Sequence, residues 1–320
     1  MTNAENENRA RVSVVVPSYN HAPFVGDCLR SIIKQSQPPS ELIVIDDGST
    51  DDSPNTIAAV LSDCPFPTEL IVRENRGLCA TLNQGLAVTN GDYFAYLSSD
   101  DIWLADFLRA RIELLERRSA AVLGYGHAYF IDKENNIIDS TADWADYADG
   151  DVRSMLLRAI GPMSPTVLYR RSALERVGWN EQSRLEDYEL YLRLSSVGEF
   201  AFDPRPLSAW RWHDANASWN QTMMLQEHLS SLRQVAPELG LTSADLSKLE
   251  RQISFRRAED FLRVGDKKAA TRLMVENFDA TSPAILARLA ARMLLPSRVE
   301  EIRRQRKQRR KTGLLGKIEV

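Results

Sequence analysis

Long hydrophobic runs are absent from this 320-residue sequence, and no stretch approaches the ~20 apolar residues that span a bilayer. Residues 1–11 are polar and lack the apolar core of a signal peptide, so we expect a disordered N-terminus there. Only three cysteines occur, Cys28, Cys64 and Cys79, without C-x-x-C spacing, which argues against a disulfide framework and a zinc site. These absences favour a cytoplasmic, reduced protein.

The sequence also lacks a large excess of either charge, because 40 Lys and Arg residues are balanced by 44 Asp and Glu residues. The net charge of -4 gives no reason to expect nucleic-acid binding. The C-terminus is different: from Ile285 onward, eleven Lys/Arg and three Glu give about +8 and leave about -12 for the rest. Apolar residues at helical spacing precede the basic cluster: Ile285, Leu286, Leu289, Met293 and Leu294. This segment predicts either contact with an anionic surface, such as the inner face of the cytoplasmic membrane, or a core-packing helix followed by a disordered tail.

Short apolar runs, the first of them rich in β-branched residues, alternate with helical segments over the first hundred residues, and this alternation predicts a parallel α/β sheet flanked by helices. The predicted strands are 12–17, 41–45, 69–72 and 93–97, and the predicted helices are 25–34, 54–62 and 78–88. No G-x-G-x-x-G follows the first strand, which argues against a dinucleotide-dependent dehydrogenase. The chain divides into a disordered N-terminus (1–11), an α/β domain (12–220), a helical region (221–295) and a basic tail (296–320).

Polar residues follow the first two predicted strands, where ligands of parallel sheets bind. Pro17 and Tyr19 follow the first strand, and Asp46 and Asp47 follow the second. Tyr19 can pack against a base, and a carboxylate can accept its ring N–H, so these residues are candidate nucleoside contacts. The alternative is that they only form turns.

Two adjacent carboxylates, Asp100 and Asp101, follow the fourth predicted strand. Mg²⁺ and Mn²⁺ prefer oxygen ligands and often bridge to substrate phosphates, so this pair is a candidate metal site. The alternative is that one of them caps a helix that begins near Leu104.

Two further motifs lie in the second half of the domain. Asp187 stands at the start of a predicted helix, where a carboxylate can act as a general base or simply complement the helix dipole. Arg211 and His213 are two residues apart on an extended segment, so they are expected to point the same way. They are candidates to meet a diphosphate and, for His213, to complete a metal shell.

The order of these motifs resembles the family 2 glycosyltransferases of bacterial surface-polysaccharide synthesis, which have the GT-A fold. The resemblance spans residues 12–218 and rests on Val12–Asn20, Leu42–Asp51, Asn75–Gly77, Asn83, Gly85, Gly91–Tyr93, Leu97–Asp101, Glu186–Leu190 and Arg211–His213. It implies a Rossmann-like mixed sheet flanked by helices, with a helical C-terminal extension. It also implies inverting transfer of a single sugar from a UDP-, dTDP- or GDP-linked donor to a hydroxyl of a glycan or polyprenyl-linked acceptor, with Mn²⁺ or Mg²⁺ as cofactor.

The resemblance also implies a role for each matching residue. Pro17, Tyr19 and Asp47 are expected to contact the nucleoside, with Asp46 beside them. Asp100 and Asp101 are expected to bind ribose and metal, and Asp187 to be the catalytic base. Arg211 and His213 are expected near the diphosphate and the metal.

The sequence departs from the family pattern at two points. Ser98 or Ser99 replaces the usual first acid of the D-x-D element, so His213 is the candidate to complete the metal shell. Leu82 stands before Asn83 where the family often has Arg. Two other functions remain open: a non-catalytic sugar- or nucleotide-binding module, and a polymerising synthase, although Ser208 occupies the Gln position of the synthases' Q-x-x-R-W element. Specificity is expected in residues 128–163 and in the C-terminal helices.

Overall fold

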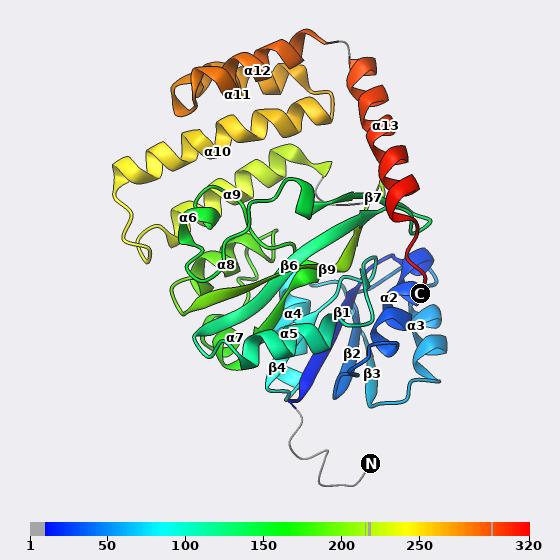
Figure 1. The fold of residues 1–320 in the computed structure, drawn as a ribbon. Helices are drawn as coiled ribbons and strands as arrows, with labels where there is room; N and C mark the ends of the chain where they lie inside the picture. Colours follow the sequence, from blue (N-terminus) through cyan, green and yellow to red (C-terminus); the bar gives the residue numbers. More distant parts are fainter. Residues whose placement is uncertain (1–9, 215, 217–218, 296) are drawn as a thin grey trace.

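The computed structural model describes residues 10–214, 216, 219–295 and 297–320, which form a mixed sheet flanked by helices and a stack of C-terminal helices beside it (Figure 1). The strands are β1 (Val12–Ser18), β2 (Glu41–Asp46), β3 (Thr68–Val72), β4 (Tyr93–Tyr96), β5 (Ile102–Trp103), β6 (Ala121–Ile131), β7 (Ile137–Ser140), β8 (Leu168–Arg170) and β9 (Glu199–Arg211). The helices of the α/β part are α2 (Ala22–Ile33), α3 (Ser53–Leu61), α4 (Leu78–Val88), α5 (Phe107–Glu116), α6 (Arg153–Leu156), α7 (Arg171–Val177) and α8 (Tyr188–Leu194). Two 3₁₀ turns, η1 (Thr141–Asp143) and η2 (Ser164–Thr166), complete this part.

The strand order is β3-β2-β1-β4-β8-β6-β9-β5, with β7 paired to β6. Strands β1 to β4 run parallel to one another, as the alternation of strands and helices predicts. Strand β8 runs antiparallel to β4 and β6, so the sheet is mixed and the predicted GT-A architecture is confirmed. Because β1, β2 and β4 are parallel, the polar residues that follow them lie at one edge of the sheet.

Helices cover both faces of the sheet, and the central strands are accordingly buried on both sides. Val15, Ile43 and Phe94 pack with α4, α7 and α8, whereas the alternate positions pack with α2, α3 and α5. Helix α4 approaches β1 closely at Gly85, where a Cβ atom would lie 2.7 Å from a Val15 methyl group. A glycine at this position therefore allows the helix to pack on the strand.

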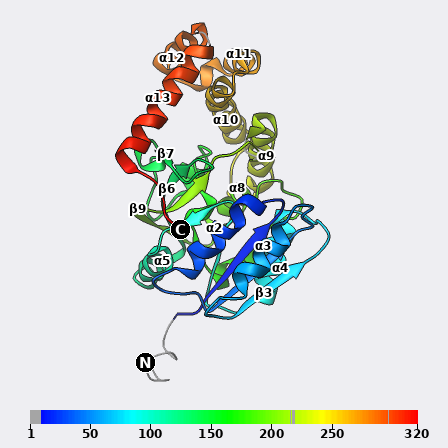
Figure 2. The same ribbon diagram turned by 90° about the vertical axis from the view of Figure 1, so that its right-hand side faces the viewer.

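The described residues at the two chain ends, 10–11 and 297–320, are ordered. Residues 1–9 of the expected disordered N-terminus lie outside the described residues, but Arg11 is ordered, and its backbone N–H donates to Asp92 Oδ2 at 3.2 Å. The tail after residue 296 forms the helix α13 (Ser297–Leu315), so the alternative of a disordered tail is wrong. Helix α13 runs back from the helical stack to β7, as both views show (Figures 1 and 2).

The C-terminal stack contains α9 (Gln221–Val235), α10 (Ser243–Arg263), α11 (Lys267–Glu276), the 3₁₀ turn η4 (Phe278–Ala280) and α12 (Pro283–Leu294). Three residues of the apolar stripe on α12, Leu286, Leu289 and Met293, pack into a small core with α10 and α11. Ile285 and Leu294 are exposed. The core-packing alternative thus accounts for most of this stripe. Among the described helices, none is both long and apolar enough to cross a membrane.

Candidate functional site

A cavity of about 730 Å³ opens at the carboxyl ends of β1, β2 and β4 and extends beneath α9 and α10. Five of the predicted site residues line it: Pro17, Tyr19, Asp47, Asp100 and Asp187. The motifs that lie 30 to 90 residues apart in the sequence therefore meet in one space. Residues from the second half of the chain, including Trp144, Trp212 and Arg257, line the same cavity.

The first corner of the cavity lies at the ends of β1 and β2. Tyr19 is half-exposed there, so its ring is accessible to a ligand. The Asp47 carboxylate accepts hydrogen bonds from the backbone N–H groups of Arg76 (3.0 Å) and Gly77 (2.8 Å) and pairs with Arg73 at 2.8 Å. These contacts fix the carboxylate at the wall of the cavity.

Asp46 differs from its neighbour. Its carboxylate is fully buried and accepts hydrogen bonds from the Ser49 N–H at 2.9 Å and from the Ser49 hydroxyl at 2.7 Å. The alternative of a turn residue describes Asp46 well, whereas Asp47 reaches the cavity. Gly48, between them and Ser49, has a φ of +83°, and a Cβ there would lie 2.9 Å from the Asn75 nitrogen. Glycine is the residue that tolerates this conformation.

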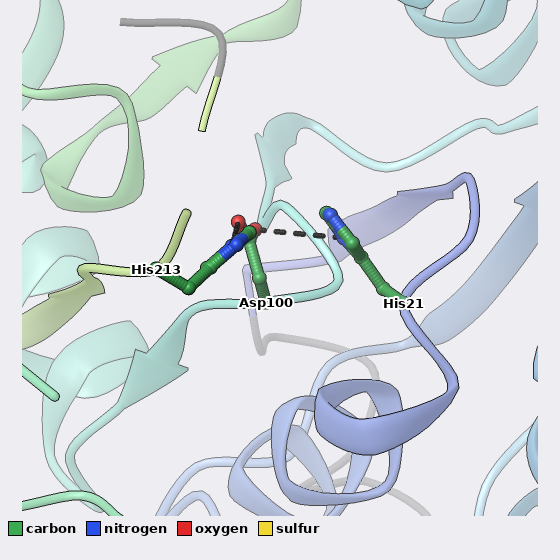
Figure 3. Close-up of side chains that lie close together, drawn as sticks. All are labelled: His21, Asp100 and His213. Atoms are coloured by element: carbon green, nitrogen blue, oxygen red, sulfur yellow. Dashed lines mark hydrogen bonds and ion pairs between the residues drawn. The ribbon is translucent and has the colours of Figure 1, made fainter. Parts of the chain in front are cut away.

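The second corner holds a group of three metal-binding side chains, His21, Asp100 and His213, drawn in Figure 3. One ligand atom from each lies within 4.8 Å of the others. His213 Nε2 lies 2.9 Å from one Asp100 oxygen, and His21 Nδ1 lies 3.8 Å from the other. His21 Nδ1 also hydrogen-bonds the Ser99 hydroxyl at 2.8 Å.

The protonation states of Asp100 and His21 suit metal binding. Burial alone raises the pKa of Asp100, but the hydrogen bond with His213 and the nearby His21 lower it below its usual value, so the carboxylate is ionised. Burial lowers the pKa of His21, which keeps its imidazole neutral and able to donate a lone pair. Two imidazoles and one carboxylate form a mixed nitrogen and oxygen donor set.

Neither acidic residue of the loop caps a helix. Strand β5 follows directly after Asp101, and α5 begins only at Phe107, so the helix-cap alternative for Asp100 and Asp101 is wrong. Asp101 turns away from the three-residue group and accepts a hydrogen bond from the Arg211 N–H at 2.9 Å. Burial and the neighbouring Asp100 raise the pKa of Asp101 well above its usual value.

Arg211 also lies elsewhere than a diphosphate contact requires. Its guanidinium group is fully buried, and it donates to the Asp100 backbone oxygen at 2.7 Å and to the Asp132 backbone oxygen at 3.0 Å. It also stacks over the Phe24 ring, 5.0 Å from the centroid. Buried polar groups are held by such hydrogen bonds, and these direct Arg211 beneath the Asp100 loop as a support, away from the cavity lining.

The third corner contains two carboxylates, Glu186 and Asp187, both partly buried in the cavity wall. Asp187 is the N-cap of α8 and accepts from the Tyr188 N–H at 2.6 Å, so it complements the helix terminus and faces the cavity at once. Glu186 accepts a hydrogen bond from the Tyr96 hydroxyl at 3.1 Å. Burial, followed by the charge of Asp187, raises the pKa of Glu186 to about 7.

Sequence reasoning missed two members of the site. His21 directly follows the motif that contains Tyr19, and Glu186 directly precedes Asp187. Both are titratable residues next to recognised ones, and this proximity is the signal that could have identified them. Their convergence with Asp100 depends on how the strand-end loops fold.

The known proteins that this chain is similar to include glycosyltransferases. Residues 13–178 match the family model described as Glycosyl transferase family 2. The chain is 28% identical over 190 residues to the chondroitin synthase of Escherichia coli, covering 59% of this chain and 27% of that protein. It is also 28% identical over 172 residues to an uncharacterized glycosyltransferase of Nostoc, covering 52% of this chain and 53% of that one. The chain therefore spans about half of the Nostoc relative and less of the synthase.

Two solved structures have the same fold. TarS 1–349 of S. aureus, crystallised in complex with UDP-GlcNAc, superposes with a TM-score of 0.61 at 15% identity and 92% coverage of both chains. The mannosyltransferase PcManGT of Pyrobaculum calidifontis, in complex with GDP-Man and Mn²⁺, gives a TM-score of 0.61 at 19% identity, covering 96% of this chain and 86% of that one. The family match extends over half of the chain, and so this chain belongs to glycosyl transferase family 2, with the GT-A fold.

Proposed function

We propose that this glycosyltransferase carries out an inverting, metal-dependent transfer of a single sugar from a nucleotide-sugar donor to an acceptor hydroxyl. The acceptor would be a glycan or a lipid-linked oligosaccharide in cell-surface polysaccharide assembly. One observation carries the proposal: a single cavity is lined by Asp47, by His21 and Asp100, and by the pair Glu186 and Asp187. Each chemical task of the transfer thus has a candidate residue in the same space.

The donor would bind across the first two corners. Tyr19 and Asp47 lie at the ends of adjacent parallel strands, where they can contact the base and hold its ring nitrogen. Relatives of this fold were crystallised with UDP-GlcNAc and with GDP-Man, and both kinds of donor, together with dTDP-sugars, are candidates for this chain.

His21, Asp100 and His213 would hold the metal, since their donor atoms lie within 4.8 Å of one another. Mg²⁺ demands near-ideal octahedral oxygen coordination, which two imidazoles do not supply, so this set favours Mn²⁺ over Mg²⁺. A bound Mn²⁺ would offset the negative charge that develops on the departing diphosphate. Asp101 was expected in this shell and remains a candidate only if it exchanges its hydrogen bond to Arg211 for the metal.

Asp187 would act as the base in a single displacement. Its carboxylate takes the proton of the acceptor hydroxyl while that oxygen forms a bond to the anomeric carbon. The bond from that carbon to the phosphate oxygen breaks, and the nucleoside diphosphate leaves with the electron pair. Because attack and departure occur on opposite faces, one displacement inverts the anomeric configuration. Glu186, with its raised pKa, would stay protonated over part of the neutral range and keep the pair from carrying two negative charges.

The test is a thermal-shift screen of UDP-, dTDP- and GDP-sugars with and without Mn²⁺, followed by nucleotide release in the presence of glycan acceptors. We expect at least one donor to raise the melting temperature only when Mn²⁺ is present. If no donor stabilises the protein under either condition, the proposal is rejected. Donor binding without nucleotide release would favour a non-catalytic module, and products longer by many sugars would favour a polymerising synthase.

We also propose that α13 contacts an anionic membrane surface. Its exposed residues include Arg303, Arg306, Arg309 and Arg310, and each basic residue near such a surface contributes about 1 kcal/mol. We expect the full chain to co-sediment with vesicles that contain phosphatidylglycerol, and the triple variant R306E, R309E, R310E to lose most of this binding. Equal sedimentation with neutral phosphatidylcholine vesicles, or an unchanged triple variant, would contradict the proposal.

A further inference from the structure

A series of aromatic rings lines part of the cavity. It consists of Phe130 on β6, Trp144 just after η1, Trp210 on β9, and Trp212 and Trp219 beyond the end of β9. The centroids are 6.1 Å apart for Trp144 and Phe130, 5.4 Å for Phe130 and Trp210, and 6.0 Å for Trp210 and Trp212. The rings are tilted or perpendicular to one another. They form a continuous wall and do not cover one another's faces by parallel stacking.

The inner end of this wall adjoins the candidate metal group. The Trp219 indole N–H donates to the His213 backbone oxygen at 2.9 Å, and Trp212 precedes His213 in the chain. The outer end is Trp144, whose side of the cavity is open: the residue is 56% exposed. A molecule that reaches from solvent to the reaction centre would pass along these rings.

Trp144 is exposed, yet the segment that carries it is fixed from two sides. The Thr141 hydroxyl accepts a hydrogen bond from the Ala128 N–H at 2.9 Å, which joins η1 to β6. From the other side, Lys307 on α13 pairs with Asp139 at 2.8 Å, and Lys311 pairs with Asp143. A ring held in place before a ligand arrives loses little conformational freedom on binding, which favours affinity.

We propose that Phe130, Trp144 and Trp210 form an outer acceptor subsite that binds a pyranose ring of a glycan, an inference that rests on the proposed transfer reaction. A pyranose presents C–H groups on its faces and hydroxyls around its edge, so it requires flat apolar surfaces together with hydrogen-bonding groups. The cavity supplies both, because Ser164, Asn216 and Asp187 line it along with the rings. A polyprenyl chain would bury the Asp187 carboxylate against hydrocarbon, which is costly. The acceptor of this enzyme is therefore a glycan of at least two sugars, with the second sugar on the outer rings.

The test uses saturation-transfer NMR on the full chain with a mixture of the methyl pyranosides of glucose, galactose, mannose and N-acetylglucosamine. These probes share the C–H face that the rings would recognise. We expect saturation of the ring C–H protons of at least one pyranoside. Aromatic contacts contribute about 0.5–1.5 kcal/mol, so Trp144→Ala should weaken this binding by about two- to tenfold, and Trp144→Phe should retain most of it.

The control variant is Phe278→Ala, which removes another exposed aromatic ring, on η4 in the helical stack, and should change nothing. Absence of saturation for every pyranoside, or equal saturation in the wild type and Trp144→Ala, would overturn the proposal. Farnesyl diphosphate, tested in parallel, would identify a lipid occupant if Trp144→Ala weakened it and left the pyranosides unaffected. The donor thermal shift is measured on the same variants: donor binding without pyranoside binding overturns only the subsite, whereas pyranoside binding without donor binding overturns the transfer reaction.

Discussion

The two halves of the cavity are built in different ways. One half, which we call the donor half because we propose that it binds the donor, consists of loops that directly follow parallel strands. The pairing of these strands therefore fixes the backbone that carries Tyr19, Asp47 and Asp100. The other half, which we call the acceptor half because we propose that it binds the acceptor, is formed by β6, β9, the segment after β7 and the C-terminal helices. Chemistry common to a family can reside in the first half, because strand ends change little when loops vary. In the acceptor half, substitutions at positions far apart in the sequence can change which acceptor is bound.

The largest effect is expected where the two halves meet, at Asp187. Asp187→Asn removes the proposed base and keeps the shape, so transfer should fall by about 10²–10⁴-fold while donor affinity stays the same. Nucleotide release with acceptor and donor thermal shift measure the two quantities separately. Asp146→Asn, an exposed carboxamide substitution near Trp144, is the matched control. Near-normal turnover of Asp187→Asn would reject the assignment.

The neighbouring Glu186 affects stability through its pKa, which is raised from 4.5 to about 7. Between these two values the folded protein keeps a proton that the unfolded chain releases, so the free energy of unfolding falls as the pH rises through this window. Glu186→Gln removes this dependence. As the pH rises from 5 to 8, the free energy of unfolding of the variant should therefore increase by about 1–3 kcal/mol relative to that of the wild type. The upper end of this range stays below the full effect of the pKa shift, because water in the cavity screens part of the interaction.

Urea unfolding of both proteins at the two pH values gives this difference directly. Glu189→Gln is a poor control, since Glu189 pairs with Arg193 at 2.8 Å, so Glu181→Gln at an exposed position five residues before Glu186 serves instead. A difference between wild type and Glu186→Gln that does not change with pH would mean that the Glu186 pKa is not raised.

A third prediction concerns the metal in the donor half. His21→Ala removes one of three proposed ligands. Loss of an outer partner already costs 10–100-fold in metal affinity, and so the loss of a ligand should weaken Mn²⁺ binding by at least about tenfold. Paramagnetic resonance of free Mn²⁺ measures this without reference to activity. Asp101→Asn provides the comparison: unchanged Mn²⁺ affinity would assign Asp101 to the support of Arg211, whereas a loss as large as that of His21→Ala would place it in the metal shell.

Sequence alone predicted the sheet and much of the donor half, because the relevant information is local. A buried apolar run followed by a polar loop is visible in ten residues, and Tyr19, Asp47 and Asp100 all follow such runs. The sequence determined the contacts of Arg211 and His213 less well. Arg211 and His213 were expected to point the same way, and both do reach Asp100, but Arg211 binds its backbone oxygen from below while His213 meets the carboxylate. Spacing along a strand does not specify which side of a loop each residue approaches.

The acceptor half was located only as a region, residues 128–163 with the C-terminal helices. Phe130 and Trp210 are 80 residues apart in the sequence and become neighbours because β6 pairs with β9. Nothing in the sequence distinguishes these aromatic residues from core residues such as Phe94, since burial depends on the tertiary packing. The tail was likewise read from its charge, which does not reveal that Lys307 and Lys311 have partners on the segment around η1.

The smallest predicted effect tests whether α13 belongs functionally to the acceptor half. Exposed ion pairs contribute about 0–1 kcal/mol to stability, so the double variant K307A, K311A should unfold at nearly the wild-type urea concentration. It should nevertheless bind methyl pyranosides a few-fold more weakly, because the segment that carries Trp144 loses two ion pairs with α13 and is less firmly fixed before binding. Donor thermal shift should not change, since neither lysine lines the cavity. The matched control replaces Arg303 and Arg310, which are exposed on the same helix. If the lysine variant and this control bind pyranosides equally well, α13 is only a packing element, and the other contacts of the segment, such as the hydrogen bond between Thr141 and Ala128, are enough to position Trp144.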